Sequence, residues 1–156
     1  MDTRQTILQY LQDQHTATLA TAGDEGPWAA AVFYACADDL TLYFLSDPAT
    51  RHGRDLAANP QAAATIHGDA GDWRRIKGVQ LVGRAEWVTN PLELAHAWRL
   101  YLAKFPFVHD FLRAPGEFLE AYAVRMGKVR FYRLVPRKVW FTDNERHFGK
   151  RDVLEM

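Results

Sequence analysis

Runs in which apolar and polar residues alternate make up much of the chain, separated by short stretches rich in glycine, proline, asparagine and aspartate. Alternation with a period of two is typical of strands that bury one face. Such alternation, or a short apolar run between turn residues, marks residues 16–22, 28–37, 40–45, 61–67, 76–88, 129–135 and 138–142. The last two flank Pro136, which we expect to join them. The pattern predicts six or so strands.

Helical spacing is found in four segments. Apolar residues three and four positions apart predict helices over 3–14, from Thr50 to the Asn59-Pro60 pair, from Asn90-Pro91 to Lys104, and over 108–112. Residues 117–125 are compatible with either a helix or a strand.

The order of these elements indicates the fold class. Most strands follow one another through short turns, and the longer helices interrupt the series only twice. This order favours an antiparallel sheet over an alternating βαβ chain. Gly78 and Gly83 inside the run 76–88 are expected to mark bulges or bends, which are common where sheets curl. We therefore expect a mainly β fold, an antiparallel β-barrel with peripheral helices.

Composition narrows the function classes. A chain of 156 residues has the size of one domain, so we expect a single domain over 1–156. Lys plus Arg and Asp plus Glu both number 19, so no net positive field favours nucleic acid. Bases interleave with aromatics in 72–77 and 130–138, but in strands this is more often one wet and one buried face. No apolar run approaches the ~20 residues of a membrane span. We expect a cytoplasmic protein with no nucleic-acid or membrane partner.

Cysteine and histidine point away from nucleophilic and metal chemistry. The single Cys36 lies in an apolar run, which indicates a small buried hydrophobe in a reducing compartment. The six histidines show none of the usual ligand spacings, so we expect no metal site.

The stretch LYFLSDPATRHGRDLAANP, residues 42–60, carries the most distinctive chemistry. A strand hands over to a helix there, and Ser46, Thr50, Arg51 and His52 gather at the helix N-terminus. Unpaired backbone N–H groups and the helix dipole favour anions at this position. The residues describe a cradle for a phosphate group. The alternative is a solvated first turn in which an arginine pairs with Asp55.

The neighbouring strand offers room for a flat molecule. Ala29, Ala30 and Ala31 leave little side chain on either face, so a planar ring can approach the backbone and bond to its N–H and C=O groups. Tight packing of the sheet against a helix is the alternative explanation for these small residues.

Four segments in order, TATLATAGDEGPWAAAVFYA, LYFLSDPATRHGRDLAANPQAAATI, IKGVQLVGRAEWV and VWFTDNERHFGKR, give the chain a family resemblance. The resemblance covers nearly the whole chain. The set resembles the FMN-binding split-barrel family typified by pyridoxamine 5′-phosphate oxidase. The resemblance implies a homodimer of six-stranded antiparallel split β-barrels, two FMN molecules in the clefts between subunits, and a small-molecule substrate.

The resemblance also assigns residues to parts of the cofactor. It places the flavin ring on the backbone of 29–34, the ribityl chain beside Leu45 and Ser46, and the phosphate at Arg51 and His52. Trp140 and Arg151 would come from the partner subunit. The full candidate set is Ala29, Ala30, Ala31, Val32, Phe33, Tyr34, Leu45, Ser46, Thr50, Arg51, His52, Gln80, Trp140 and Arg151.

This chain departs from the family pattern in three places. His52 stands where lysine is usual, and it carries only part of a charge at neutral pH. The oxidase's flavin-side glutamine falls at Gly78, and we expect Gln80, on the same strand face, to take its place. The segment 146–151 lacks the oxidase's arginine and histidine arrangement, so we do not expect oxidation of pyridoxamine phosphate.

The function implied is an FMN-dependent oxidoreductase that exchanges a hydride with an unknown small substrate. No catalytic side chain is assigned, and Trp28, Trp73 and Phe148 are candidates to shape the substrate pocket. The alternatives are a flavin-binding protein without turnover, or a protein of this fold that holds haem or a deazaflavin.

Overall fold

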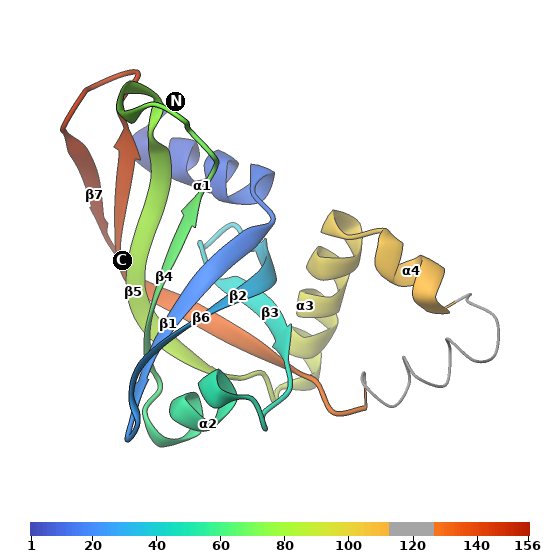
Figure 1. The fold of residues 1–156 in the computed structure, drawn as a ribbon. Coiled ribbons are helices and arrows are strands. Elements are labelled where there is room, and N and C mark those ends of the chain that lie inside the picture. The colour runs from blue at the N-terminus through green and yellow to red at the C-terminus, as the bar shows by residue number, and fades with distance from the viewer. Residues whose placement is uncertain (113–126) are drawn as a thin grey trace.

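An antiparallel sheet that curls into a barrel forms the body of the molecule in the computed structural model, which describes residues 1–112 and 127–156 (Figure 1). The strands follow the order β3-β2-β1-β4-β5-β6-β7, and β3 also pairs with β6, which closes the barrel. The mainly β class expected from the sequence is confirmed. The strands are β1 (Thr16–Gly23), β2 (Gly26–Cys36), β3 (Leu42–Ser46), β4 (Gln61–His67), β5 (Lys77–Trp87), β6 (Arg130–Asp143) and β7 (Arg151–Glu155).

Two expectations about the strands are wrong. β6 runs unbroken through Pro136, because this proline lies where the register with β5 shifts between Val82 and Gly83, and a bulge tolerates a missing N–H. β7 is a further strand, which pairs with β6 from Lys138 to Thr142.

Only one of the two expected glycine irregularities is present. Gly83 lies at the bulge, where an added Cβ would lie 2.1 Å from the Val135 carbonyl oxygen. Gly78 pairs in regular register with His67 on one side and Thr142 on the other.

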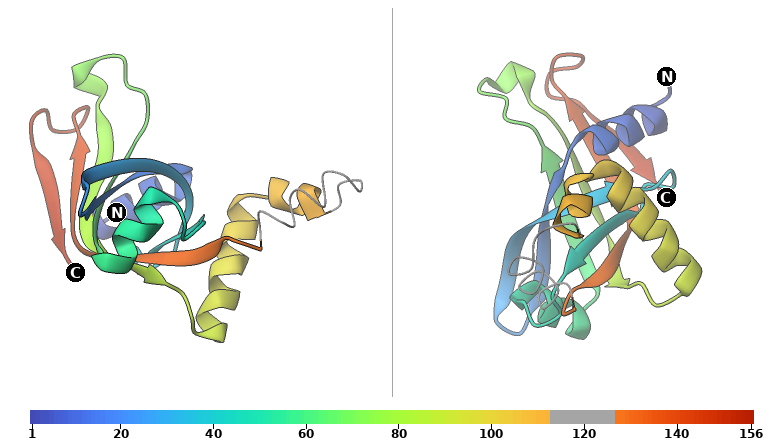
Figure 2. Two further views of the ribbon diagram at one scale, coloured as in Figure 1. Left: turned by 60° about the horizontal axis from the view of Figure 1, so that its bottom comes forward. Right: turned by 90° about the vertical axis from the view of Figure 1, so that its right-hand side faces the viewer.

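The expected helices are all present, with the segment 117–125 outside the described residues. They are α1 (Thr3–Asp13), α2 (Arg51–Ala58), α3 (Pro91–Lys104) and α4 (Phe107–Leu112), together with a single 3₁₀ turn, η1 (Trp73–Arg75). Figures 1 and 2 show α1 and α2 at opposite ends of the barrel and α3 and α4 on one side of it. None of the helices that the structure describes is long and apolar enough to cross a membrane.

Two apolar clusters stabilise this arrangement. The barrel interior joins the inward residues of the strands to Ile7 and Leu11 of α1. The second cluster packs Ala97 and Tyr101 of α3 against Phe131 of β6 and its neighbours. Cys36 is buried in the first, as expected, and burial raises the pKa of its thiol to about 12. A thiol so held is not a nucleophile at neutral pH.

The barrel is open along one edge of β2. β3 pairs only with residues 34–36 of β2, so residues 27–33 have no strand of the described chain on that side. The Tyr34 amide donates to the His15 carbonyl. The backbone N–H and C=O groups of the even-numbered residues of β2 therefore point toward β1. Alternate residues face opposite edges, so Ala29, Ala31 and Phe33 direct their N–H and C=O groups to the open edge.

Candidate functional site

The junction between β3 and α2 presents the N-terminus of a capped helix. Thr50 caps α2 by accepting a hydrogen bond from the Gly53 amide at 3.1 Å. Gly53 packs so closely on the preceding loop that an added Cβ would lie 2.6 Å from the Pro48 carbonyl oxygen. The amides of Arg51 and His52 have no hydrogen-bond partner within the described ranges. Two N–H groups are therefore free at the positive end of the helix.

Arg51 is held by the protein itself. Its Nε lies 3.2 Å from both carboxylate oxygens of Asp55, and its Nη2 donates to the Gly26 carbonyl at 3.1 Å. Nη1 lies 3.3 Å from Glu25, and the guanidinium lies 5.0 Å from the Trp28 ring centroid. The pairing with Asp55 matches the alternative drawn from the sequence, but Arg51 is not splayed into water, since its side chain is 18% exposed. Arg51 therefore ties the β1–β2 turn to α2.

Asp55 and Asn59 complete this attachment of α2 to the sheet. The Asp55 carboxylate is buried and accepts the Thr21 hydroxyl at 2.9 Å. The Asn59 side-chain amide donates to the Ala22 carbonyl at 3.3 Å. The helix N-terminus is consequently fixed relative to the open edge of β2.

Ser46 and His52 form a buried pair under the first turn of α2. The Ser46 hydroxyl and His52 Nε2 are hydrogen-bonded, and Thr50 Oγ1 lies 3.3 Å from the same nitrogen. Burial lowers the pKa of His52, and the charge of Asp55 opposes this only in part. The imidazole is therefore neutral at neutral pH and supports the Ser46 hydroxyl.

The remaining predicted side chains of this region serve packing. Val32 packs against the barrel core and Leu45 against the second cluster. Tyr34 is buried, and its hydroxyl donates to the Leu11 carbonyl at 2.6 Å. Phe33 lies near Phe105, with ring centroids 5.5 Å apart. At these positions the backbone, rather than the side chain, is what a ligand can reach along the edge.

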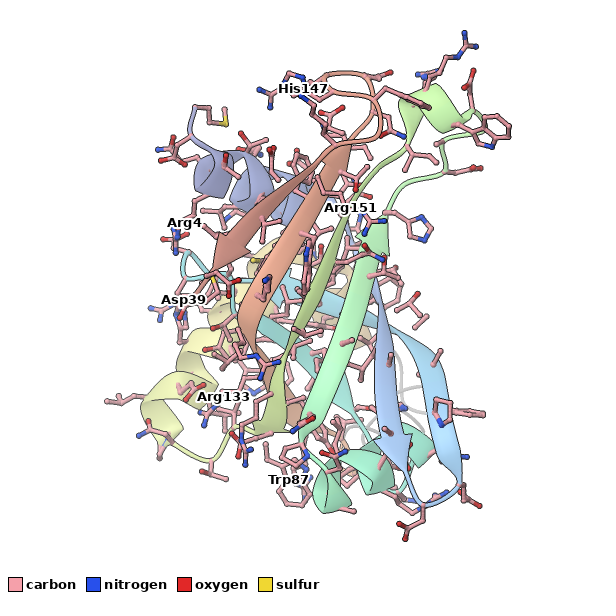
Figure 3. The ribbon with its side chains drawn as sticks, turned by 90° about the vertical axis from the view of Figure 1, so that its left-hand side faces the viewer. Arg4, Asp39, Trp87, Arg133, His147 and Arg151 are labelled. Carbon is pink, nitrogen blue, oxygen red and sulfur yellow. The ribbon has the colours of Figure 1, made fainter. Side chains whose placement is uncertain are left out.

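A flat face of small residues extends from this edge across the sheet (Figure 3). One row of cross-strand neighbours runs through Ala31, Thr18, Thr65, Gln80 and Trp140. The next runs through Ala29, Ala20, Ala63 and Val82. At ~4.8 Å per strand, Ala31 and Trp140 lie about 19 Å apart in one copy of the chain.

The structure thus divides the predicted residues into two groups. The first surrounds the β2 edge and the start of α2. The second, Gln80, Trp140 and Arg151, lines one hollow of about 390 Å³ that reaches across β4, β5 and β6 to Thr18 and Ala20 of β1. Figure 3 shows Arg151 on this face. Gln80 belongs with the two residues that the sequence assigned to a partner subunit.

Sequence reasoning missed two partners of Arg51, Glu25 and Gly26, although it allowed for Asp55. Glu25 and Gly26 belong to the turn between β1 and β2, and no periodicity links a turn to a helix 25 residues later. Of the aromatics proposed for a pocket, Trp28 lies against Arg51, while Trp73 and Phe148 are 80% and 65% exposed on loops. Across residues 1–112 and 127–156, no three His, Cys, Asp or Glu side chains are grouped to hold a metal ion.

Comparison with known proteins defines the class. A family model described as pyridoxamine 5′-phosphate oxidase matches residues 3–143, and the chain belongs to this family. A UPF0306 protein of Photorhabdus laumondii is 32% identical over 148 residues, which span 94% of this chain and 92% of the relative.

Solved structures share the fold. A conserved hypothetical protein from Mycobacterium tuberculosis matches with a TM-score of 0.73 at 20% identity, over 94% of this chain and 88% of the other. A haem-binding protein from Mycobacterium smegmatis matches with a TM-score of 0.71 at 22% identity, over 97% of this chain and 56% of the other.

Proposed function

We propose that the protein is an FMN-binding oxidoreductase that acts on a small organic molecule. The observation that carries this proposal is the open edge of β2 beside the free N-terminus of α2. A flavin mononucleotide needs both a planar resting place and an anion site, and this junction offers the two on adjacent elements.

The residues present fit the cofactor. The free amides of Arg51 and His52 would hold the phosphate together with Arg51 Nη1, which is shared with Glu25. The Thr50 hydroxyl already donates to the Asp47 carbonyl at 2.7 Å and would have to turn from it to contribute. The buried hydrogen bond between Ser46 and His52 would hold the first turn of α2 in place. The outward N–H and C=O groups of Ala29, Ala31 and Phe33 would bond to the edge of the ring, as an added strand would.

A second copy of the chain completes the proposed site. Trp140 lies four strands along its own sheet from Ala31, and we infer that the second group comes from a neighbouring subunit. The small residues Ala20 and Ala63 at the centre of the flat face allow two sheets to approach closely. A two-fold axis there would give a homodimer with two equivalent sites.

Bound FMN would supply hydride exchange, which no protein side chain provides. The chain's own residues would orient the ring, fix the phosphate and exclude water. No nucleophilic side chain is required, in keeping with the buried and protonated Cys36.

Spectroscopy of the protein as purified, or after addition of FMN, tests this function. We expect a bound flavin spectrum that bleaches when a nicotinamide nucleotide is added. A flavin spectrum that no reductant donor changes would indicate a flavin-binding protein without turnover. Absence of flavin binding at micromolar concentrations would refute the proposal.

Haem is the second candidate, since the Mycobacterium smegmatis neighbour is described as a haem-binding protein. The same spectrum separates the two, because a Soret band would appear in place of the flavin bands. Haem also requires an axial ligand. If the protein holds haem through a histidine, substituting the exposed histidines one at a time should identify a single variant that loses the Soret band.

A further inference from the structure

A second hollow of about 370 Å³ lies at the end of the flat face, where the β4–β5 and β6–β7 connections meet. Its floor is one row of cross-strand neighbours, His67, Gly78, Thr142 and Arg151. Gly78 contributes no side chain to this row, so a depression remains between His67 on one side and Thr142 with Arg151 on the other.

Positive charge and hydrogen-bond donors surround this depression. Lys77, Lys150 and Arg151 line it, and no aspartate or glutamate does. The Lys77 side chain lies on the inward face of β5, with Nζ 6.0 Å from the Phe141 ring centroid, so the charge that faces the hollow is that of Lys150 and Arg151. Lys77 is paired with Asp143 at 3.4 Å, whereas the side chains of Lys150 and Arg151 have no ion pair or hydrogen bond within the described chain. The next acid along, Asp152, pairs with inward-facing Phe141 and so lies on the opposite face of β7.

The walls of the hollow are held in place by the protein. The Asn144 side chain donates to the Trp73 carbonyl at 2.7 Å and accepts from the Gly149 amide at 3.3 Å. The Asn144 amide donates to the Ile76 carbonyl at 3.0 Å. These bonds join the two connections, and the positive φ of Gly149 turns the chain directly before Lys150. The backbone that carries Lys150 and Arg151 is therefore held in place before any ligand arrives.

The remaining surfaces suit a small organic molecule. Ile76, 41% exposed, gives the hollow an apolar wall. His67 Nδ1 lies 3.0 Å from the Gly68 carbonyl, to which it can only donate, so Nε2 of the neutral imidazole is an acceptor for a hydroxyl or amine of the bound molecule. Thr65, Gln80 and Arg151 line both this hollow and the one that contains Trp140, which makes the two continuous.

We propose that this hollow binds the oxyanion of the small molecule on which the protein acts, a carboxylate or a phosphoryl group seated over Gly78 beside Lys150 and Arg151. The body of that molecule then extends along Gln80 toward Trp140, where the partner's flavin would lie. As an assignment of substrate class, the inference rests on the proposed function. The anion site itself does not require a flavin and is tested separately.

Calorimetric titration of the full-length protein tests the site, with phenyl phosphate, benzoate and the neutral benzamide as probes. We expect at least one anion to bind and benzamide to bind at least about tenfold more weakly. The stronger of the two anions identifies a phosphoryl or a carboxylate site.

Variants locate the binding. Lys150→Gln should weaken anion binding about tenfold or more, because it removes an unpaired charge at the hollow. Arg146→Gln is the matched control, since it removes one charge from the same loop but does not line the hollow. We expect it to change affinity by less than about twofold. Gly78→Val should fill the depression and abolish binding, while Lys150→Gln, on an exposed turn, folds normally.

Three results would overturn the inference. Benzamide could bind as well as the anions, Lys150→Gln could match Arg146→Gln, or saturating FMN could compete with phenyl phosphate, which would assign the hollow to the cofactor. FMN binding is measured on the same samples. Loss of flavin binding alone would remove the proposed function and leave Lys150-dependent anion binding in place.

Discussion

Arg51 illustrates how one residue can serve both structure and ligand. Its guanidinium neutralises Asp55, whose side chain is only 7% exposed, before any phosphate is present. A buried carboxylate without its cation is costly. A flavin-binding defect at Arg51 therefore has to be separated from a loss of stability.

The Arg51→Ala variant should lose on the order of 2 kcal/mol of unfolding free energy, because Asp55 keeps only Thr21 as a partner. Arg54→Ala is the control, since Arg54 is exposed and bonds only to the Ala49 carbonyl. We expect its change to stay within about 0.5 kcal/mol. Urea denaturation of both variants checks this, and equal stabilities would contradict the role given to Asp55.

Lys104 predicts a specific pH dependence. Its Nζ donates to the Leu11 carbonyl and lies 4.1 Å from the Tyr34 ring centroid, and burial lowers its pKa to about 8. Between pH 8 and its ordinary value of 10.5, the unfolded chain binds the proton that the folded chain has lost. The contribution of Lys104 to stability therefore rises with pH across this window.

Denaturation at pH 8 and pH 10 measures the effect. Other groups titrate in the same range, so the comparison is with Lys104→Met, which keeps the length of the side chain. We expect wild type to gain stability relative to the variant as the pH rises. A constant difference would show that the Lys104 pKa is not lowered.

Among the elements, the pairing of β5 with β6 depends closely on one residue, Gly83. Gly83→Ala should destabilise by about 1–3 kcal/mol or more, since the added Cβ would meet the Val135 carbonyl and Pro136 at the bulge. Gly68→Ala is a matched control, because an added Cβ there meets nothing within 4 Å. Thermal or urea unfolding distinguishes them, and similar midpoints would mean that the bulge relaxes readily.

The same elements show what the sequence could predict. Strands with clear alternation and helices with capping residues were found close to their observed bounds. The prediction of two strands on either side of Pro136 was wrong because proline usually ends a strand. At a bulge the strand can continue, because no backbone N–H is needed there. β7 was missed because RDVLE is short and mostly polar, and only its pairing with β6 makes it a strand. In the candidate site, the residue types were readable from sequence, but the Glu25–Arg51–Asp55 contacts depend on how the β1–β2 turn meets α2.

For the whole molecule, the division of the proposed site between two subunits leads to a complementation test. Arg51→Gln affects the first group and Trp140→Ala the second, so each homodimer should bind FMN weakly. A mixed dimer carries one intact site and one doubly altered site, so refolding an equal mixture should restore about one quarter of the sites. Flavin fluorescence quenching measures this. Recovery no greater than in the separate variants would place both groups in one subunit.

The open margin of β2 also bears on solubility. A strand with unsatisfied backbone groups is a template on which another chain can assemble. At Pro27 a backbone N–H would point to this open edge, and proline has none. Pro27 therefore prevents strand pairing only at the first residue of the edge. Beyond it, residues 28–33 have no described strand on that side. The protein's resistance to aggregation should then follow the supply of whatever occupies the margin, and overproduction in cells short of that molecule should yield insoluble material.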